Sequence, residues 1–261
     1  MERVGIDVST HQGDINWAKV KGSVDFAIIR AGYGKNNIDN KARKNVQGCE
    51  ANGIPYGFYW FSYAYTKEMA EKEAEYFIKF ASEYKPSYPL YFDFEYDSVE
   101  YASKMGVTIT KELLHTMATA FCETLEKNGY YAGIYANADY INNKFKPEIF
   151  KKHDLWYAYW GDKPSRSVNL WQYTASGTVD GISGKVDMNK CYIDYPSIII
   201  KANLNGYKDS ENKDETTDNN TSEDTTNTEP ENNCTCLRNC CCCDCTRCHC
   251  KRHYGFRCKR C

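Results

Sequence analysis

Short apolar runs of strand length alternate with segments of helical spacing along the chain up to about residue 200. The strand-like runs cover residues 4–8, 26–31, 55–63, 89–97, 131–135, 155–160 and 169–173, and residues 178–189 have the pattern of a last hairpin. Helical spacing covers residues 40–51, 66–83 and 110–127, with shorter helical pieces at 14–17 and 138–152. The alternation of strand and helix predicts an α/β fold with a parallel sheet and right-handed crossovers.

The number and spacing of these runs favour a closed barrel. About eight strands in this length fit an irregular (β/α) barrel of the TIM type in which some helices are shortened or lost. The alternative is an open, doubly wound sheet. No Gly-rich phosphate-binding loop follows the first strand, so we favour the barrel.

The strand-like run at residues 89–97 carries acidic residues inside an apolar sequence. In an extended strand Asp93 and Glu95 point to the same face, and Phe92 and Phe94 point to the other. Two neighbouring carboxylates repel each other, and burial adds to the cost, so local folding gives no reason for them. Glycoside cleavage does require such a pair, with one carboxyl protonated and another ionised. The alternative is an edge strand with two solvated acids.

Two further acids fall at ends of predicted strands. Asp7 lies in the first strand and Asp187 in the last hairpin, and Asp93 and Glu95 lie in the fourth strand. In a barrel of this type the chemistry sits at the carboxyl ends of the strands. We therefore predict an acidic active site assembled from three separate strands.

Composition narrows the classes of function. The formal net charge of −2 gives no argument for nucleic-acid binding, and no apolar run is long enough to cross a bilayer. The 22 tyrosines fit a sugar-binding surface, although tyrosine is also ordinary core material. The N-terminus has no basic segment followed by an apolar one, so we expect no secretory signal and release of the phage type or export by another route.

The composition changes sharply near residue 206. We expect a catalytic barrel at residues 1–205, an acidic disordered linker at 206–233 and a basic, Cys-rich tail at 234–261. Cys49, Cys122 and Cys191 are far apart, which predicts a barrel that does not depend on disulfides. The tail has C-x-x-C pairs, and zinc binding, a disulfide knot and disorder all remain open for it.

An ordered set of short segments resembles glycoside hydrolase family 25, lysozymes that cleave bacterial peptidoglycan between N-acetylmuramic acid and N-acetylglucosamine. The segments that carry the resemblance are 5–9, 11–13, 15–17, 26–34, 57–61, 91–95, 155–159, 170–173 and 186–189. They extend over roughly residues 3 to 200, and the irregular barrel of that family agrees with the strand pattern. The resemblance implies an enzyme, a muramidase of the endolysin kind, that acts on the bacterial wall.

The resemblance also implies roles for the four acids. Glu95 is the expected general acid, and the charge of Asp93 is expected to raise its pKa. Asp93 is expected to orient the 2-acetamido group for attack on the anomeric carbon, with Tyr59 bracing that group. Asp7 and Asp187 are expected to tune the electrostatics. An inverting path, with water activated by Asp187 or Asp7, remains open.

Other side chains are candidates for sugar binding. They are Arg30, Tyr135, Tyr159 and Gln172. Arg30 is as readily explained as the structural partner of a carboxylate, and the tyrosines as core residues. We expect no metal, no cofactor and no nucleic acid, and a chain that works as a monomer without inserting into a membrane.

Two other functions compete with the muramidase. A chitinase-like enzyme of family 18 also uses a D-x-E pair, but Pro89 and Tyr91 stand where its longer acidic motif would have further acids. A non-catalytic glycan-binding barrel would not need all four acids.

Overall fold

The computed structural model describes residues 2–208 of the 261-residue chain. The predicted Cys-rich tail and nearly all of the predicted acidic linker lie outside the described residues. Zinc binding, disulfides and disorder in the tail therefore stay predictions.

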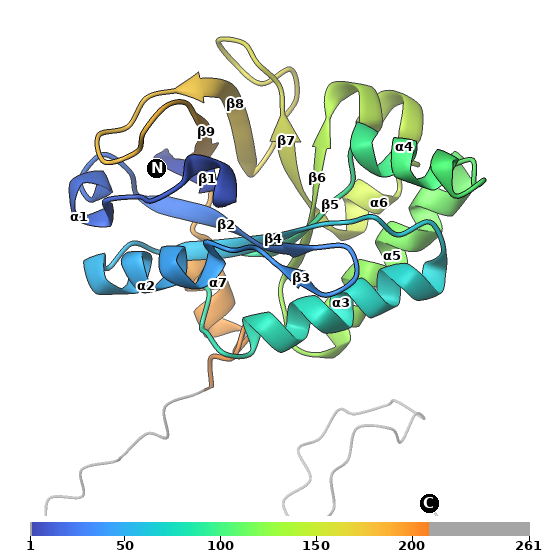
Figure 1. The fold of residues 1–261 in the computed structure, drawn as a ribbon, viewed down its shortest axis with the longest axis horizontal. Helices are drawn as coiled ribbons and strands as arrows, with labels where there is room; N and C mark the ends of the chain where they lie inside the picture. Colours follow the sequence, from blue (N-terminus) through green and yellow to red (C-terminus); the bar gives the residue numbers. More distant parts are fainter. Residues whose placement is uncertain (1, 209–261) are drawn as a thin grey trace, which may run out of the picture. The chain divides into compact units, whose positions relative to one another are not determined.

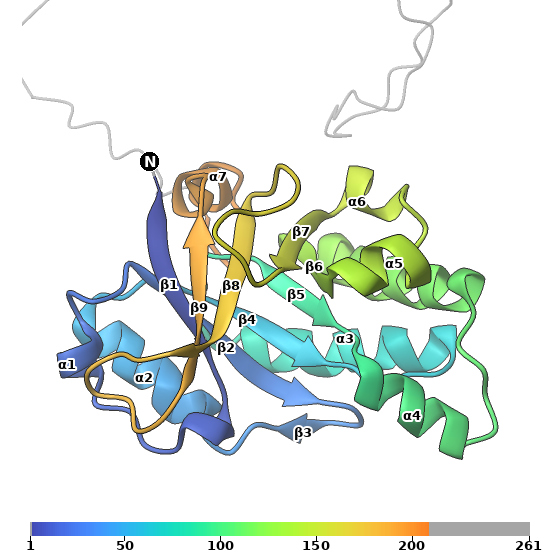
Figure 2. The same ribbon diagram turned by 90° about the horizontal axis from the view of Figure 1, so that it is seen from above.

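The predicted barrel is present. One sheet has the strand order β1-β9-β8-β7-β6-β5-β4-β2-β3, and an additional pairing between β1 and β2 closes it, with the short β3 outside the ring (Figures 1 and 2). The strands are β1 (Arg3–Val8), β2 (Phe26–Tyr33), β3 (Asn37–Ile38), β4 (Tyr56–Phe61), β5 (Leu90–Asp93), β6 (Ala132–Asn137), β7 (Asp154–Ala158), β8 (Leu170–Gly177) and β9 (Val186–Cys191). The open-sheet alternative is therefore wrong.

Helices of unequal length pack around the strands. They are α1 (Trp17–Val20), α2 (Ala42–Asn52), α3 (Lys67–Ala81), α4 (Tyr96–Lys104), α5 (Lys111–Lys127), α6 (Ile149–Lys152) and α7 (Tyr195–Lys201), with a 3₁₀ turn at Thr10–Gln12 and a π-helical turn at Tyr140–Lys144. The hydroxyls of Thr66 and Thr110 accept hydrogen bonds from Met69 N and Leu113 N, which starts the two longest helices where the sequence predicts. Among the described residues β7 leads to β8 without a helix, so the prediction of lost helices is confirmed.

Two predictions about strands are wrong. The strand expected at 89–97 ends at Asp93, and its second half begins α4, because Glu95 is the N-cap of that helix. The hairpin expected at 178–189 pairs differently: β9 runs antiparallel to β8 on one side and to β1 on the other. The sheet is therefore mixed, and only its other barrel strands are parallel.

The apolar residues of the strands divide between two cores. In β2, Phe26 and Ile28 face the barrel interior, while Ala27 and Ile29 face the outer helices. Tyr195 and Ile199 of α7 belong to the interior core, and Figure 2 shows α7 at the amino ends of β1 and β8. Because α7 fills this end of the barrel, the opposite end is where a ligand can enter.

The described residues agree with the expectations for disulfides and for membrane-spanning segments. Cys49, Cys122 and Cys191 are buried free thiols, which confirms that the described barrel does not use them for disulfides. No described helix has the length and apolar character needed to cross a bilayer.

A buried asparagine after α7 holds the amino ends of β5 and β6 together. The Asn205 side chain accepts a hydrogen bond from Tyr131 N at 2.8 Å and donates to Pro86 O and Tyr88 O at 2.9 and 3.0 Å. It is fully buried, so no water can replace these bonds. Tyr207 continues the contact by donating to Lys85 O, so the packing of the barrel extends past residue 205.

We predict that Asn205→Gly lowers the free energy of unfolding by about 3 kcal/mol, because it leaves buried backbone groups without partners. Denaturant unfolding followed by circular dichroism measures this loss. Asn203→Gly is the matched control, because both residues have φ of 55° and glycine relieves both equally. Equal stability of the two variants would show that the side-chain bonds of Asn205 contribute nothing.

Candidate active site

The four acids singled out in the sequence lie around one cavity at the carboxyl ends of the parallel strands. The cavity has a volume of about 160 Å³. Its lining residues are Asp7, Tyr59, Asp93, Glu95, Tyr135, Trp156, Trp160, Gln172, Ala175 and Asp187. Each acid comes from a different element: Asp7 from β1, Asp93 from the end of β5, Glu95 from the N-cap of α4 and Asp187 from β9.

Strand register brings Asp7 and Asp187 together. Asp7 of β1 and Asp187 of β9 are directly opposite each other in the antiparallel pair, and Asp93 is opposite Tyr135 in the β5–β6 pair. Directly opposite residues of an antiparallel pair have Cβ atoms within about 5.5 Å, so Asp7 and Asp187 are close neighbours. The backbone pairing therefore fixes these contacts before any side-chain rotamer is chosen.

Glu95 reaches the cavity from a helix cap and not from a strand. Its backbone N–H donates to the Ser98 hydroxyl at 3.1 Å, which fixes the first turn of α4. Asp93 is 3% exposed, and Glu95 is only half-buried. Phe92 and Phe94 are fully buried in the outer core, as predicted from the alternation.

Burial sets the protonation of the acids. Burial, the charge of Asp97 and the charge of Asp187, in that order, raise the pKa of Glu95 to about 7. Asp93 acts to lower that pKa, so the prediction that Asp93 raises it is wrong in its cause. Burial, then the neighbouring charges of Glu95 and Asp7, raises the pKa of Asp93 well above its usual range. Both carboxyls are therefore shifted toward their protonated forms.

Amide side chains hold Asp7 in a buried position. Gln172 Nε2 and Asn189 Nδ2 donate to Asp7 Oδ2 at 2.9 and 2.8 Å. Tyr135 in turn donates to Gln172 Oε1, and Trp156 Nε1 donates to Asn189 Oδ1. These bonds favour the charged form of Asp7, but burial and the charge of Asp187 still raise its pKa.

The predicted sugar-binding residues separate into two groups. Tyr59, Tyr135 and Gln172 line the cavity. Arg30 does not: its Nε donates to Asp39 Oδ2 at 2.8 Å, which is the structural alternative considered for it. Tyr159 is also outside the cavity and stacks on Tyr157, with ring centroids 5.7 Å apart.

Sequence reasoning missed two side chains of this site. Asn189 is fully buried against Asp7, and its place two positions after Asp187 on one strand is the signal that could have found it. Trp160 lines the cavity although it is 67% exposed. An exposed ring at the edge of an acidic cavity can cover the apolar face of a sugar.

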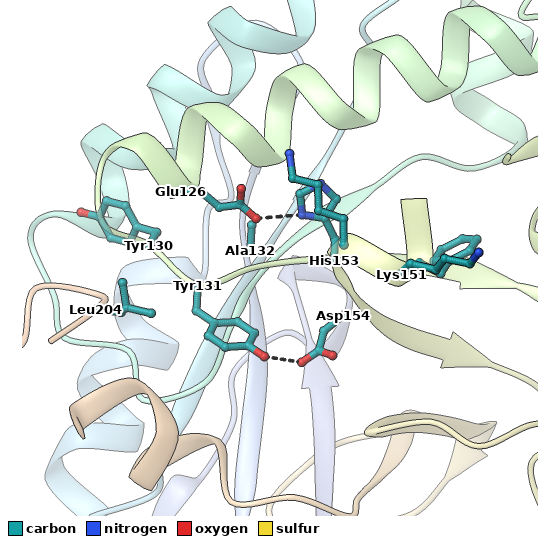
Figure 3. Close-up of a pocket in the computed structure, with 10 residues that line it drawn as sticks. Glu126, Tyr130, Tyr131, Ala132, Lys151, His153, Asp154 and Leu204 are labelled. Carbon is teal, nitrogen blue, oxygen red and sulfur yellow. Dashed lines mark hydrogen bonds and ion pairs between the residues drawn. The ribbon is translucent and has the colours of Figure 1, made fainter. Parts of the chain in front are cut away.

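A second cavity, of about 340 Å³, lies at the amino ends of β6 and β7 (Figure 3). Its acids are already paired: Tyr131 donates to Asp154 at 2.6 Å, and Glu126 lies 2.8 Å from His153 Nδ1. The acids of the smaller cavity repel each other instead, so that cavity is the candidate active site. In residues 2–208 no group of three or more His, Cys, Asp or Glu side chains is arranged to hold a metal ion.

Comparison with known proteins identifies a matching family and similar curated proteins. The family model of glycosyl hydrolases family 25 matches residues 6–182. Lysozyme M1 of Streptomyces globisporus is 31% identical over 199 residues, which are 71% of this chain and 66% of the lysozyme.

Solved structures are similar as well. The autolysin LytC of Streptococcus pneumoniae, solved with a synthetic peptidoglycan ligand, has a TM-score of 0.66 and 29% identity over 73% of this chain and 47% of its own. The catalytic domain of endolysin ply40 from a Listeria monocytogenes bacteriophage has a TM-score of 0.63 and 25% identity over 76% of this chain and 97% of its own. This chain thus spans about two thirds of the curated lysozyme and about half of LytC. The family match, over more than half of its length, shows that the chain belongs to glycosyl hydrolases family 25.

Proposed function

We propose that this chain is a muramidase that hydrolyses the β-1,4 bond between N-acetylmuramic acid and N-acetylglucosamine in bacterial peptidoglycan. The observation that carries the proposal is the cavity in which Asp7, Asp93, Glu95 and Asp187 face one another. Family membership and the lysozyme, autolysin and endolysin relatives support the same substrate and action on the cell wall.

Glu95 is the general acid of the proposed reaction. Its raised pKa, about 7, keeps a proton available at neutral pH, and it is more exposed than Asp93. The Glu95 carboxyl gives that proton to the glycosidic oxygen as the bond from this oxygen to the anomeric carbon breaks. After the leaving sugar departs, the Glu95 carboxylate takes a proton from the water that attacks the anomeric carbon.

Asp93 positions the nucleophile. Its Oδ1 is buried and has no hydrogen-bond partner among the described residues, which is unusual for a buried carboxylate. An N–H of the substrate's 2-acetamido group would supply the missing donor. The acetamido carbonyl oxygen then forms a bond to the anomeric carbon as the glycosidic bond breaks, and water later opens the resulting ring. Tyr59, which lines the same cavity, braces the group.

Asp7 and Asp187 stabilise the positive charge that develops at the sugar. Asp7 is held by Gln172 and Asn189, so its carboxyl is already oriented and no reorientation is needed during the reaction. Tyr135 and Gln172 fix the geometry from the opposite strands. All these groups come from one chain, which supports action as a monomer.

Glu95→Gln is predicted to reduce the release of reducing sugar from purified peptidoglycan by about a thousandfold, because it removes the acid. Circular dichroism and denaturant unfolding should match the wild type. Asp180→Asn, on an exposed loop, is the control. Activity within tenfold of the wild type would mean that another group is the acid. A wild type that binds walls without cleaving them would favour a glycan-binding barrel.

The stereochemistry of the product tests the role of Asp93. Attack by the acetamido group followed by water inverts the anomeric carbon twice, so we predict retention of the β configuration. Proton NMR of the first-formed sugar from a soluble glycan fragment, recorded before mutarotation, measures it. An α product would replace the acetamido route with direct attack by water activated by Asp7 or Asp187.

The alkaline limb of the pH profile should depend on Asp97. The charge of Asp97 raises the pKa of Glu95, and Glu95 must be protonated to act. Asp97→Asn therefore lowers this pKa, and activity is lost at a lower pH than in the wild type. Values of kcat/KM measured from pH 4 to 9 give the shift in the pKa of the alkaline limb, with Asp180→Asn as the control. An unchanged or higher pKa of the alkaline limb in Asp97→Asn would show that this pKa does not belong to Glu95.

A further inference from the structure

A pocket of about 430 Å³ lies beside the mouth of the barrel and shares no residue with the acidic cavity. Its walls come from four places: the turn after β2, the segment between β4 and α3, and the helices α3 and α4. The residues that define it, here called the tyrosine pocket, are Lys35, Tyr63, Tyr65, Lys72, Tyr76 and Tyr101.

Aromatic contacts build the floor of the tyrosine pocket. The Tyr63 and Tyr101 rings meet edge to face at 5.2 Å, and Tyr65 lies 6.2 Å from Tyr101. Beneath them Glu73 Oε1 accepts a hydrogen bond from Tyr63 N at 3.1 Å, and Glu73 is 3% exposed. The buried carboxyl thus fixes the backbone that carries Tyr63, so the floor is a preformed surface.

The tyrosine pocket lies close to the strand end that carries Asp93. Tyr63 packs against Tyr33 at 6.5 Å, and the Arg30 guanidinium lies 5.6 Å from the centre of the Tyr33 ring. The neighbouring Ser62 N donates to the backbone oxygen of Asp93 at 2.7 Å. Tyr63 therefore directly follows a residue that is hydrogen-bonded to Asp93, which places the pocket next to the strand that carries this acid.

Charge distinguishes the rim of the tyrosine pocket from the acidic cavity. Lys35 and Lys72 are exposed on the rim, while the buried Glu73 is its one acid among the described lining residues, with a pKa raised by burial to about 7. Lys72 lies 2.5 Å from Glu75, an exposed pair that contributes little and can exchange for another carboxylate. An occupant with carboxylates and small apolar groups is favoured over a neutral sugar.

We propose that the tyrosine pocket binds the peptide stem carried by the muramic acid units of peptidoglycan. The inference rests on the proposed function, because the stem reaches the pocket from a glycan held at the acids. Its alanine methyl groups match the tyrosine floor, and its free carboxylates match Lys35 and Lys72. The pocket makes the enzyme favour strands that keep their stems.

The test compares one glycan with and without stems. Soluble, uncrosslinked peptidoglycan strands are used as prepared and after an amidase has removed the stems. We expect Lys35→Glu/Lys72→Glu to lower kcat/KM about tenfold on the strands with stems and to leave it unchanged on the bare strands. Lys79→Glu/Lys201→Glu changes the net charge equally at exposed positions away from the pocket and is the control. An equal loss on both substrates would indicate a sugar subsite, and no loss would indicate an empty pocket. Either result overturns the proposal.

A binding measurement separates this proposal from the proposed function. Glu95→Gln protein is titrated with the tripeptide L-alanyl-γ-D-glutamyl-L-lysine and followed by NMR. We expect chemical-shift changes at the pocket tyrosines, and a dissociation constant at least fivefold higher in the Lys35→Glu/Lys72→Glu background. This result supports the pocket even if the wild type cleaves nothing. Absence of binding at millimolar peptide overturns it even if the muramidase activity is found.

Discussion

Repulsion among buried carboxylates is the constraint on which this structure depends. Asp7 is 5% exposed and Asp93 is 3% exposed, and each faces another acid. Such a group is tolerated in a folded protein only if it is protonated or receives hydrogen bonds. Asp7 receives two, from Gln172 and Asn189, while Asp93 receives none at Oδ1. Asp7 is therefore stabilised by protein donors, whereas Asp93 keeps a free acceptor atom, Oδ1, for a substrate.

The direction of β9 decides which of its residues lie at the cavity. An all-parallel barrel would put the carboxyl end of each strand at the mouth, where the last strand could present only its final residues. Because β9 runs antiparallel between β8 and β1, its amino end is at the mouth. Asp187 and Asn189 then point to the same face, one toward the cavity and one toward Asp7. The reversed strand thus supplies an acid and the amide that holds its neighbour.

Hydrophobic pattern alone predicted the barrel and most of its elements, and the ends of strands predicted the four acids of the cavity. The pattern failed where a residue's partner lies far away in sequence. The spacing from Asp187 places Asn189 on the face of the site, but nothing local identifies its partner Asp7, 182 residues away. The run at 89–97 misled for another reason: its aromatic residues suit a strand, but the Ser98 hydroxyl caps Glu95 and starts a helix.

The position of Glu95 at the start of α4 sets two effects against each other. A helix N-terminus favours a negative charge there by roughly 0.3–1 kcal/mol, which lowers the pKa of a carboxyl. Burial and the charges of Asp97 and Asp187 act in the opposite direction, and they raise this pKa from 4.5 to about 7, which corresponds to roughly 3 kcal/mol. Burial and the neighbouring charges have the larger effect on the pKa of Glu95. The helix cap therefore fixes the position of Glu95, while the cavity determines its protonation. Asp93, at the end of β5, is 3% exposed, whereas the cap position leaves Glu95 half-buried and more accessible to a leaving oxygen.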